Sequence, residues 1–175
     1  PVLLQETLPV AGRDAWQLAR ALDRLALRLL RRGVADLSAG DTLPAAPQDE
    51  RAATWAPEPV GELLRVRWTW PNARVLRRIR ALSPVPGLAI EVAGQKLFVT
   101  RATATRTLST LLEPGEAAVL GVPGALVIRT GDGAIQVEQA LATPGEENLD
   151  RGAIVQRVAQ RRREVLDCVP LGGNG

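Results

Sequence analysis

The chain has 175 residues, 46% of them hydrophobic, which is enough for one sizeable core or for a small domain and part of another. It contains no histidine and one cysteine, so by itself it cannot form a Ser-His-Asp or Cys-His catalytic pair, a histidine or thiolate metal site, or an intramolecular disulfide. The formal net charge of +3 is mild, so a preference for nucleic acid has to come from where the charges lie.

The first forty residues predict a strand followed by a helix. Residues 2–10, VLLQETLPV, are typical of a short strand, and Asp14 and Gln17 have the spacing of a capping box at the start of a helix over 14–32. Leucines recur at helical spacing from Leu18 to Leu29. A strand without a local partner and a helix with an uncovered apolar face are not expected to be stable alone. We therefore expect residues 1–40 to need a missing sheet, a partner chain or, as a substitute, the β-barrel predicted further along this chain.

Residues 41–62 are predicted to be a linker because four prolines interrupt them. The segment 63–70, LLRVRWTW, alternates in polarity and is predicted to be extended. Its Trp68 and Trp70 share one face, where either core packing or stacking on a nucleobase would suit them. A helix follows over 72–82, with Asn72 as its cap and Val75, Ile79 and Leu82 on its apolar face.

Short strands separated by tight turns dominate the next part of the chain. Together they predict a small β-barrel domain over residues 63–148. The Gly131-Asp132-Gly133 sequence is interpreted as a hairpin turn and not as a metal-binding turn. A helix over 149–168, with Ile154 and Val158 facing inward, and a disordered tail over 169–175 complete the prediction. The predicted strands are 88–92, 96–104, 117–122, 125–130 and 134–141.

Basic residues are concentrated in one part of the chain. Residues 65–106 contain nine basic residues and one acidic residue. Residues 1–58, in contrast, contain seven basic and eight acidic residues. This asymmetry indicates a polyanion partner such as RNA, although a solvated helix face with a few salt bridges is the alternative. Odd spacing along a strand predicts that Lys96 and Arg101 lie on opposite faces. The candidate nucleic-acid-binding residues are Arg74, Arg77 and Arg78 on the helix, and Lys96 and Arg101 on the strands.

Four short motifs, in order, resemble the methionyl-tRNA formyltransferase family. Residues 79–87, IRALSPVPG, are similar to the "IRAFNPWPGA" element that opens the C-terminal domain of that family. Upstream, PQDE at 47–50 and ATWAP at 53–57 resemble the family's "PQDE…ATYAP" linker. Downstream, TGDG at 130–133 is similar to the turn before its last barrel strand, and 141–145 corresponds to its "LQPEGKK" ending. The first residues, PVLLQ, match the "GPILLQ" that follows the family's catalytic loop.

The resemblance implies an α+β fold: a strand-helix remnant of an α/β formyltransferase domain, then a small OB-like β-barrel with a short helix and a C-terminal helix. It implies a parent enzyme that moves a formyl group from 10-formyltetrahydrofolate to an aminoacyl-tRNA. The family's catalytic Asn-His-Asp set would lie before residue 1, so this chain is expected to contain no catalytic residue and to bind no cofactor itself. The expected partners are tRNA and a missing N-terminal catalytic half or a partner chain.

Two alternatives remain open at this point. The run Ser83-Pro84-Val85-Pro86 stands where the family has Asn-Pro-Trp-Pro, and the family's usual lysines are mostly absent. A formyltransferase acting on a sugar or a peptidyl amine, or a non-enzymatic scaffold module, would therefore fit as well. A chain without disulfides or a long apolar run is expected to be cytoplasmic and without a membrane span.

Overall fold

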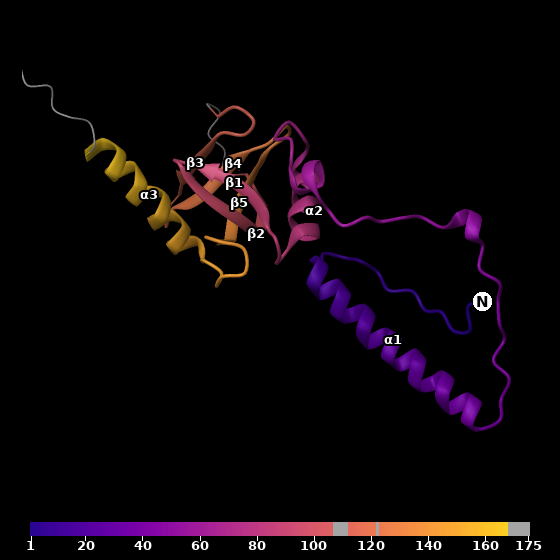
Figure 1. Cartoon of the computed structure of the whole chain (residues 1–175). Coiled ribbons are helices and arrows are strands. Elements are labelled where there is room, and N and C mark those ends of the chain that lie inside the picture. The colour runs from indigo at the N-terminus through magenta and orange to yellow at the C-terminus, as the bar shows by residue number, and fades with distance from the viewer. Residues whose placement is uncertain (107–111, 122, 168–175) are drawn as a thin grey trace, which may run out of the picture. The chain divides into compact units, whose positions relative to one another are not determined.

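The structure is a computed structural model that describes residues 1–106, 112–121 and 123–167, with side chains described as far as residue 160. The chain divides into two compact units, Pro1–Pro59 and Val60–Gly175 (Figure 1). The division falls within the segment 41–62 that the sequence predicts as a linker. The predicted disordered tail, 169–175, lies outside the described residues.

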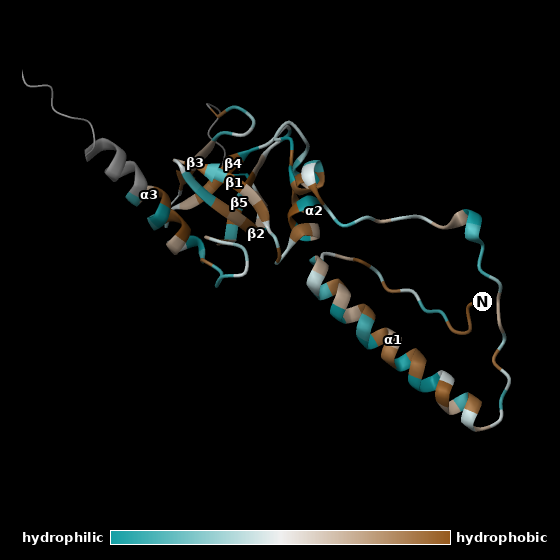
Figure 2. Cartoon of the chain, viewed as in Figure 1, coloured by the Kyte–Doolittle hydropathy of each residue, from teal (hydrophilic) through white to brown (hydrophobic). Residues whose placement is uncertain are grey.

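The first unit is built around one long helix, α1, which spans Ala15–Ser38. Asp14 accepts a hydrogen bond from the Gln17 backbone N–H at 2.7 Å, and the Gln17 side chain accepts one from the Asp14 N–H at 3.2 Å, so the predicted capping box is confirmed. The helix runs further than expected, passing through Gly33 before it ends. Hydrophobic and hydrophilic residues are interspersed along its length (Figure 2).

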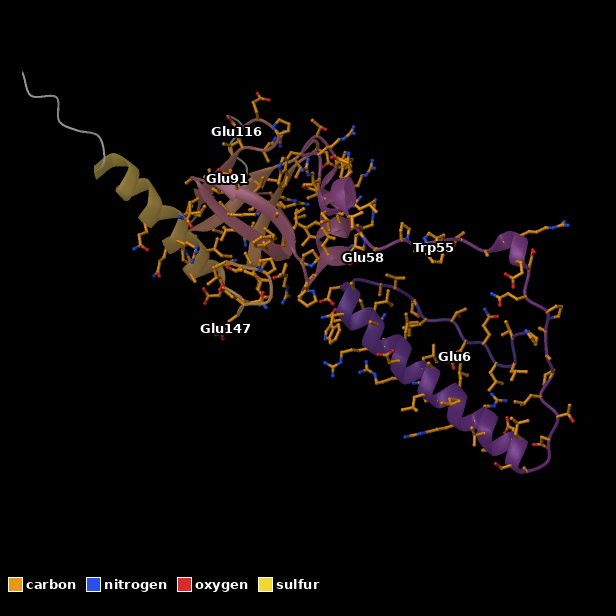
Figure 3. The ribbon with its side chains drawn as sticks, viewed as in Figure 1. Glu6, Trp55, Glu58, Glu91, Glu116 and Glu147 are labelled. Carbon is orange, nitrogen blue, oxygen red and sulfur yellow. The ribbon has the colours of Figure 1, made fainter. Side chains whose placement is uncertain are left out.

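The strand predicted over residues 2–10 does not form. Val2 makes one isolated bridge with Ala46, through hydrogen bonds of 2.7 and 3.0 Å, and the rest of the segment is irregular. The segment contacts α1 through side chains instead. Glu6, labelled in Figure 3, makes an ion pair with Arg28 on α1 at 3.6 Å. A strand needs a ladder of backbone partners, and the first unit supplies only Ala46.

The segment after α1 is mostly irregular. A short 3₁₀ turn, η1, spans Glu50–Ala52 and begins at Asp49, whose side chain accepts from the Arg51 N–H at 3.0 Å. Trp55 follows it on an extended stretch, and the side chain is 90% exposed (Figure 3).

The predicted strand over 63–70 is also absent. A 3₁₀ turn, η2, spans Gly61–Leu64, and the residues after it make local backbone hydrogen bonds, such as that from the Trp70 N–H to the Arg67 carbonyl at 2.9 Å. The alternating sequence pattern nevertheless sorts the side chains as expected. Leu64, Val66, Trp68 and Trp70 pack against the core of the second unit, so core packing is the outcome for both tryptophans.

The helix α2 spans Asn72–Leu82, and its predicted apolar face is confirmed because Val75, Ile79 and Leu82 are no more than 2% exposed. The prediction that Asn72 caps this helix is wrong. Pro71 occupies the cap position, and the Asn72 N–H donates to the Asp132 carboxylate at 2.7 Å, across 60 residues of sequence. The Asn72 side-chain oxygen accepts from the Thr130 hydroxyl, also at 2.7 Å.

A curled antiparallel sheet in the order β1-β2-β5-β4-β3 forms the body of the second unit (Figure 1). All five predicted strands are therefore confirmed. The core joins the sheet to α2 and to the last helix, and it contains the largest buried side chains of this unit, such as Leu97, Ile128 and Ile135. The strands are β1 Leu88–Val92, β2 Gln95–Thr105, β3 Ala117–Leu120, β4 Ala125–Arg129 and β5 Ala134–Leu141.

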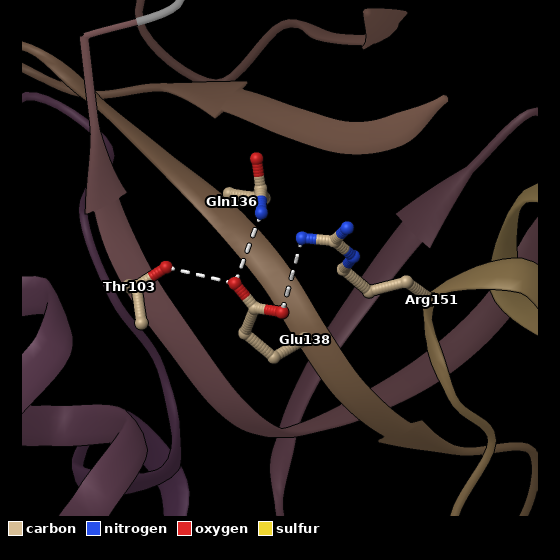
Figure 4. Close-up of polar contacts among 4 residues, drawn as sticks. All are labelled: Thr103, Gln136, Glu138 and Arg151. Atoms are coloured by element: carbon tan, nitrogen blue, oxygen red, sulfur yellow. Dashed lines mark hydrogen bonds and ion pairs between the residues drawn. The ribbon is translucent and has the colours of Figure 1, made fainter. Parts of the chain in front are cut away.

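A third helix, α3, spans Arg151–Asp167 and packs on the sheet through Ile154 and Val158, which are 0% and 3% exposed as predicted. Asp150 caps it by accepting from the Ala153 N–H at 2.8 Å. Its first residue is also tied to β5, because Arg151 lies 3.6 Å from the Glu138 carboxylate. The same carboxylate accepts hydrogen bonds from Thr103 and Gln136, so one acidic group links β2, β5 and α3 (Figure 4).

Candidate nucleic-acid interface

Arginines gather around Trp70 at the start of α2. The Arg74 guanidinium carbon lies 3.9 Å from the centre of the Trp70 ring, and that of Arg78 lies 5.7 Å from it. Both distances are in the range of cation–π attraction. Because Val75 and Ile79 are buried beneath α2, the helix presents these arginines on its outer side. The structure thus brings together two of the five residues predicted from the sequence.

A groove of about 350 Å³ lies between α2 and the segment that precedes it, and we call it the α2 groove. The Arg78 side chain donates a hydrogen bond to the Leu63 carbonyl, which connects the two walls. The groove contains four arginines and one glutamate, so its lining has a charge of +3. The lining residues are Glu62, Leu63, Arg65, Val66, Arg67, Trp70, Arg74 and Arg78.

Arg65 and Arg67 also line the groove, although neither is among the candidate residues predicted from the sequence. They alternate with Val66 and Trp68, which pack on the core, so the pattern already placed both arginines on the exposed side. Arg65 makes an ion pair with Glu62 at 3.5 Å, with side chains 75% and 80% exposed. The sequence pattern does not show that this segment lies next to α2, because the segment reaches α2 without forming a strand.

The other three candidate residues do not line the α2 groove. Arg77 is an exposed residue of α2. Lys96 is exposed on β2, opposite Glu91 of β1, with its ammonium 5.3 Å from the centre of the Phe98 ring. Arg101 is exposed further along the same strand. The candidates therefore form one cluster on α2 and two separate positions on β2.

The expectation that Lys96 and Arg101 lie on opposite faces of their strand is wrong. The register of β2 against β5 shifts on both sides of Arg101. As a result the side chains that face the core are at odd-numbered positions before the irregularity, Leu97 and Val99, and at an even-numbered position after it, Ala102. The residue before each inward position faces out, so Lys96 and Arg101 lie on the same, outer side. A β-bulge breaks the two-residue period on which the prediction relied.

The turn at Gly131-Asp132-Gly133 is a hairpin between β4 and β5, as predicted, and it also holds the start of α2. Asp132 accepts from the Asn72 N–H, and the Gly131 N–H donates to the Trp70 carbonyl at 3.1 Å. Among the residues that the structure describes, no group of three or more His, Cys, Asp or Glu side chains is arranged to hold a metal ion.

The first unit carries a second surface of different character. A groove of about 340 Å³ runs between α1 and the two segments that flank it, and its lining is apolar. Several of its residues are exposed, among them Leu30 at 63% and Leu37 at 56%. We call it the α1 groove. Its lining residues are Val2, Leu3, Leu4, Leu29, Leu30, Gly33, Val34, Leu37 and Leu43.

Comparisons with known sequences point to one family. Residues 61–155 match the family described as the formyl transferase C-terminal domain. The methionyl-tRNA formyltransferase of Deinococcus radiodurans is 34% identical over 166 residues, which cover 87% of this chain and 49% of that protein. The methionyl-tRNA formyltransferase of Thiobacillus denitrificans is 33% identical, covering 81% of this chain and 45% of its own. The chain therefore spans about half the length of the curated relatives it matches.

Solved structures of HypX from Aquifex aeolicus have the same fold. One of them, in complex with tetrahydrofolic acid, has a TM-score of 0.67 at 23% identity and covers 89% of this chain and 27% of its own. A second, variant structure has a TM-score of 0.68 at 22% identity. At this identity the likeness shows the fold, and it confirms the predicted α+β class. No helix within the described ranges has the length and apolar character needed to cross a membrane.

Proposed function

The chain belongs to the formyltransferase C-terminal domain family, as its motifs imply, and we propose that its second unit binds tRNA for a methionyl-tRNA formyltransferase. The parent reaction would transfer the formyl group of 10-formyltetrahydrofolate to the amino group of an aminoacyl-tRNA, in the cytoplasm, at the start of translation. In this proposal the chain binds the RNA, and a catalytic half that it does not include carries out the formyl transfer.

The observation that supports this proposal is the cluster of arginines around Trp70. Guanidinium groups bind phosphate oxygens through paired N–H donors and stay charged at all physiological pH values. Arg74, Arg77 and Arg78 place three of them on one helix, which the buried face of α2 holds in position. Phosphate contacts of this kind supply affinity and orientation without reading the base sequence. Lys96 and Arg101, on the outer side of β2, would extend the contact.

The exposed apolar surface of the first unit supports the second part of the proposal. Large exposed apolar patches on water-soluble domains mark surfaces that another chain or segment covers. The matched relatives are about twice as long as this chain, which provides a specific occupant for the α1 groove. We propose that the catalytic half of a formyltransferase packs its sheet against α1 there.

The positive charge of the α2 groove favours the tRNA proposal over its two rivals. A sugar or a peptidyl amine offers no polyanion to a groove with a charge of +3, and a scaffold module has no need of one. Binding of a phosphate-rich RNA is therefore expected under the tRNA proposal and under neither rival.

Titration of tRNA against the full chain tests the proposal. If about three phosphates are neutralised, affinity should fall roughly 40-fold between about 50 and 200 mM salt, following the counterion-release relation for duplex nucleic acid. The triple variant Arg74→Gln, Arg77→Gln, Arg78→Gln should flatten this salt dependence. A charge-matched control, Arg20→Gln, Arg24→Gln, Arg31→Gln on α1, should leave it unchanged. A wild-type chain that fails to bind tRNA at low salt would refute the proposal.

A further inference from the structure

We propose that the α2 groove is a site for a single phosphodiester of the RNA backbone, with Trp70 as a platform for arginine and Glu62 as a carboxylate that competes with the phosphate. This inference rests on the proposed tRNA-binding function and adds a specific site to it. It assigns roles to two residues, Trp70 and Glu62, that carry no positive charge.

The position of Arg74 decides what Trp70 can do. The ring packs on the core, and the Arg74 guanidinium lies over it at 3.9 Å from the centroid. A nucleobase stacking on the ring would have to displace that guanidinium. A guanidinium stacked on an aromatic ring keeps its N–H donors, which lie in its own plane and point away from its edges. Stacking on Trp70 therefore leaves Arg74 able to bind a phosphate.

Pre-organisation explains why a tryptophan in this place favours anion binding. Free arginine side chains lose rotamer entropy when they bind a ligand. Arg74 is already held by the Trp70 ring, and Arg78 is held by the Leu63 carbonyl. Both side chains come from α2, while Arg65 and Arg67 come from the opposite wall. An anion in the groove would meet guanidinium groups from two sides.

The size of the groove limits the ligand. A volume of about 350 Å³ is near the lower end of the range for small-molecule sites. It suits one phosphate with its adjoining sugar and not a base pair or a helix. A phosphodiester from a locally exposed stretch of backbone has the matching charge and size.

Glu62 lines the groove and pairs with one of its arginines. Its carboxylate lies 3.5 Å from the Arg65 guanidinium, and its side chain is 80% exposed, so it can move out into solvent at little cost. A phosphate entering the groove has to replace this pairing and also meets the negative charge of Glu62. Removing that charge should therefore strengthen RNA binding.

The test compares tRNA affinities of full-length variants at low salt. Glu62→Gln should bind about two- to five-fold tighter than wild type, since an exposed ion pair has about that effect on an equilibrium constant. The matched control is Glu147→Gln, an exposed residue of the same unit that makes the same change in net charge and should have little effect. A gain in affinity cannot arise from misfolding, which makes this variant decisive.

A second pair of variants tests the platform. Trp70→Leu should weaken binding about two- to five-fold, because cation–π contacts at exposed sites are of that strength, while the charges stay the same. Trp70→Phe keeps a ring and should fall between Trp70→Leu and wild type. If Glu62→Gln equals Glu147→Gln, or if Trp70→Leu binds like wild type while tRNA binding itself persists, the groove proposal is refuted and the proposed function stands. If the wild type binds no tRNA, both are refuted.

Discussion

Substituting Gly131 by alanine should destabilise the second unit strongly, because the backbone of another segment occupies the space of the added methyl group. A Cβ built at Gly131 would lie 2.1 Å from the Thr69 carbonyl oxygen and 2.7 Å from its carbon. The Gly131 N–H also donates to the Trp70 carbonyl at 3.1 Å, so the turn cannot rotate away without losing that bond. The obstacle is backbone, which cannot rotate aside as the end of a flexible side chain can.

The expected loss in the free energy of unfolding follows from the shift of the β4–β5 turn. Relief of the clash requires the β4–β5 turn to shift by roughly 1 Å, and overpacking of this kind costs about 1–3 kcal/mol. The shift also weakens the hydrogen bond to Trp70, worth about 1 kcal/mol, and the contact of Asp132 with the first turn of α2, worth about 1 kcal/mol. We expect a loss of about 3–5 kcal/mol in the free energy of unfolding and a fall in Tm of roughly 12–20 °C.

Urea unfolding followed by tryptophan fluorescence measures this loss. Trp68 and Trp70 are packed on the core, whereas Trp16 and Trp55 are 59% and 90% exposed, so the change in emission reports on the second unit. The control is Gly152→Ala in α3, where the added Cβ lies 3.4 Å from the Asp150 carboxylate and helix propensity favours alanine by up to about 1 kcal/mol. A Gly131→Ala variant that loses less than about 1 kcal/mol would show that the close approach is absent from the folded protein.

Three further substitutions test other parts of the structure. Asp14→Ala should remove the capping box and cost α1 about 1 kcal/mol, seen as faster hydrogen exchange in its first turn; unchanged exchange would contradict the cap. Ile154→Ala should cost about 2–5 kcal/mol in urea unfolding because the side chain is fully buried between α3 and the sheet, and a loss below about 1 kcal/mol would mean that α3 does not pack there. Thr130→Val keeps the shape but removes the hydroxyl that donates to Asn72, and should cost about 1–2 kcal/mol; a neutral result would refute that bond.

Features set by neighbouring residues were predictable from the sequence. The capping box of α1 involves residues three positions apart, and a glycine-containing turn between two apolar-rich segments signals each of the hairpins β1–β2, β3–β4 and β4–β5. The apolar face of α2 follows from helical spacing alone. In each case the physics that fixes the structure acts within one turn or one strand pair.

Features that depend on distant partners were not predictable. The alternation in 63–70 indicated which side chains face the core, but a strand also needs a neighbour with free backbone groups, and this segment bonds locally instead. Asn72 has a side chain that suits a helix cap. Its own N–H nevertheless donates to the carboxylate of Asp132, which lies 60 residues later in the sequence. The α2 groove was missed for the same reason, since Arg65 and Arg78 line it from two separate segments, which the hydrogen bond from Arg78 to the Leu63 carbonyl connects.

The hairpin turn over 130–133 holds two elements of the proposed RNA site in place. Three of its groups reach into residues 70–72: the Thr130 hydroxyl and the Asp132 carboxylate bind Asn72, and the Gly131 N–H binds the Trp70 carbonyl. Trp70 supports Arg74 from below, and Asn72 begins the helix that carries Arg74 and Arg78. The turn therefore fixes both the platform and the helix that present the guanidinium groups. It follows that substitutions in the turn should weaken RNA binding even though the turn contributes no positive charge, and that this loss should leave the salt dependence unchanged, because the number of phosphate contacts stays the same.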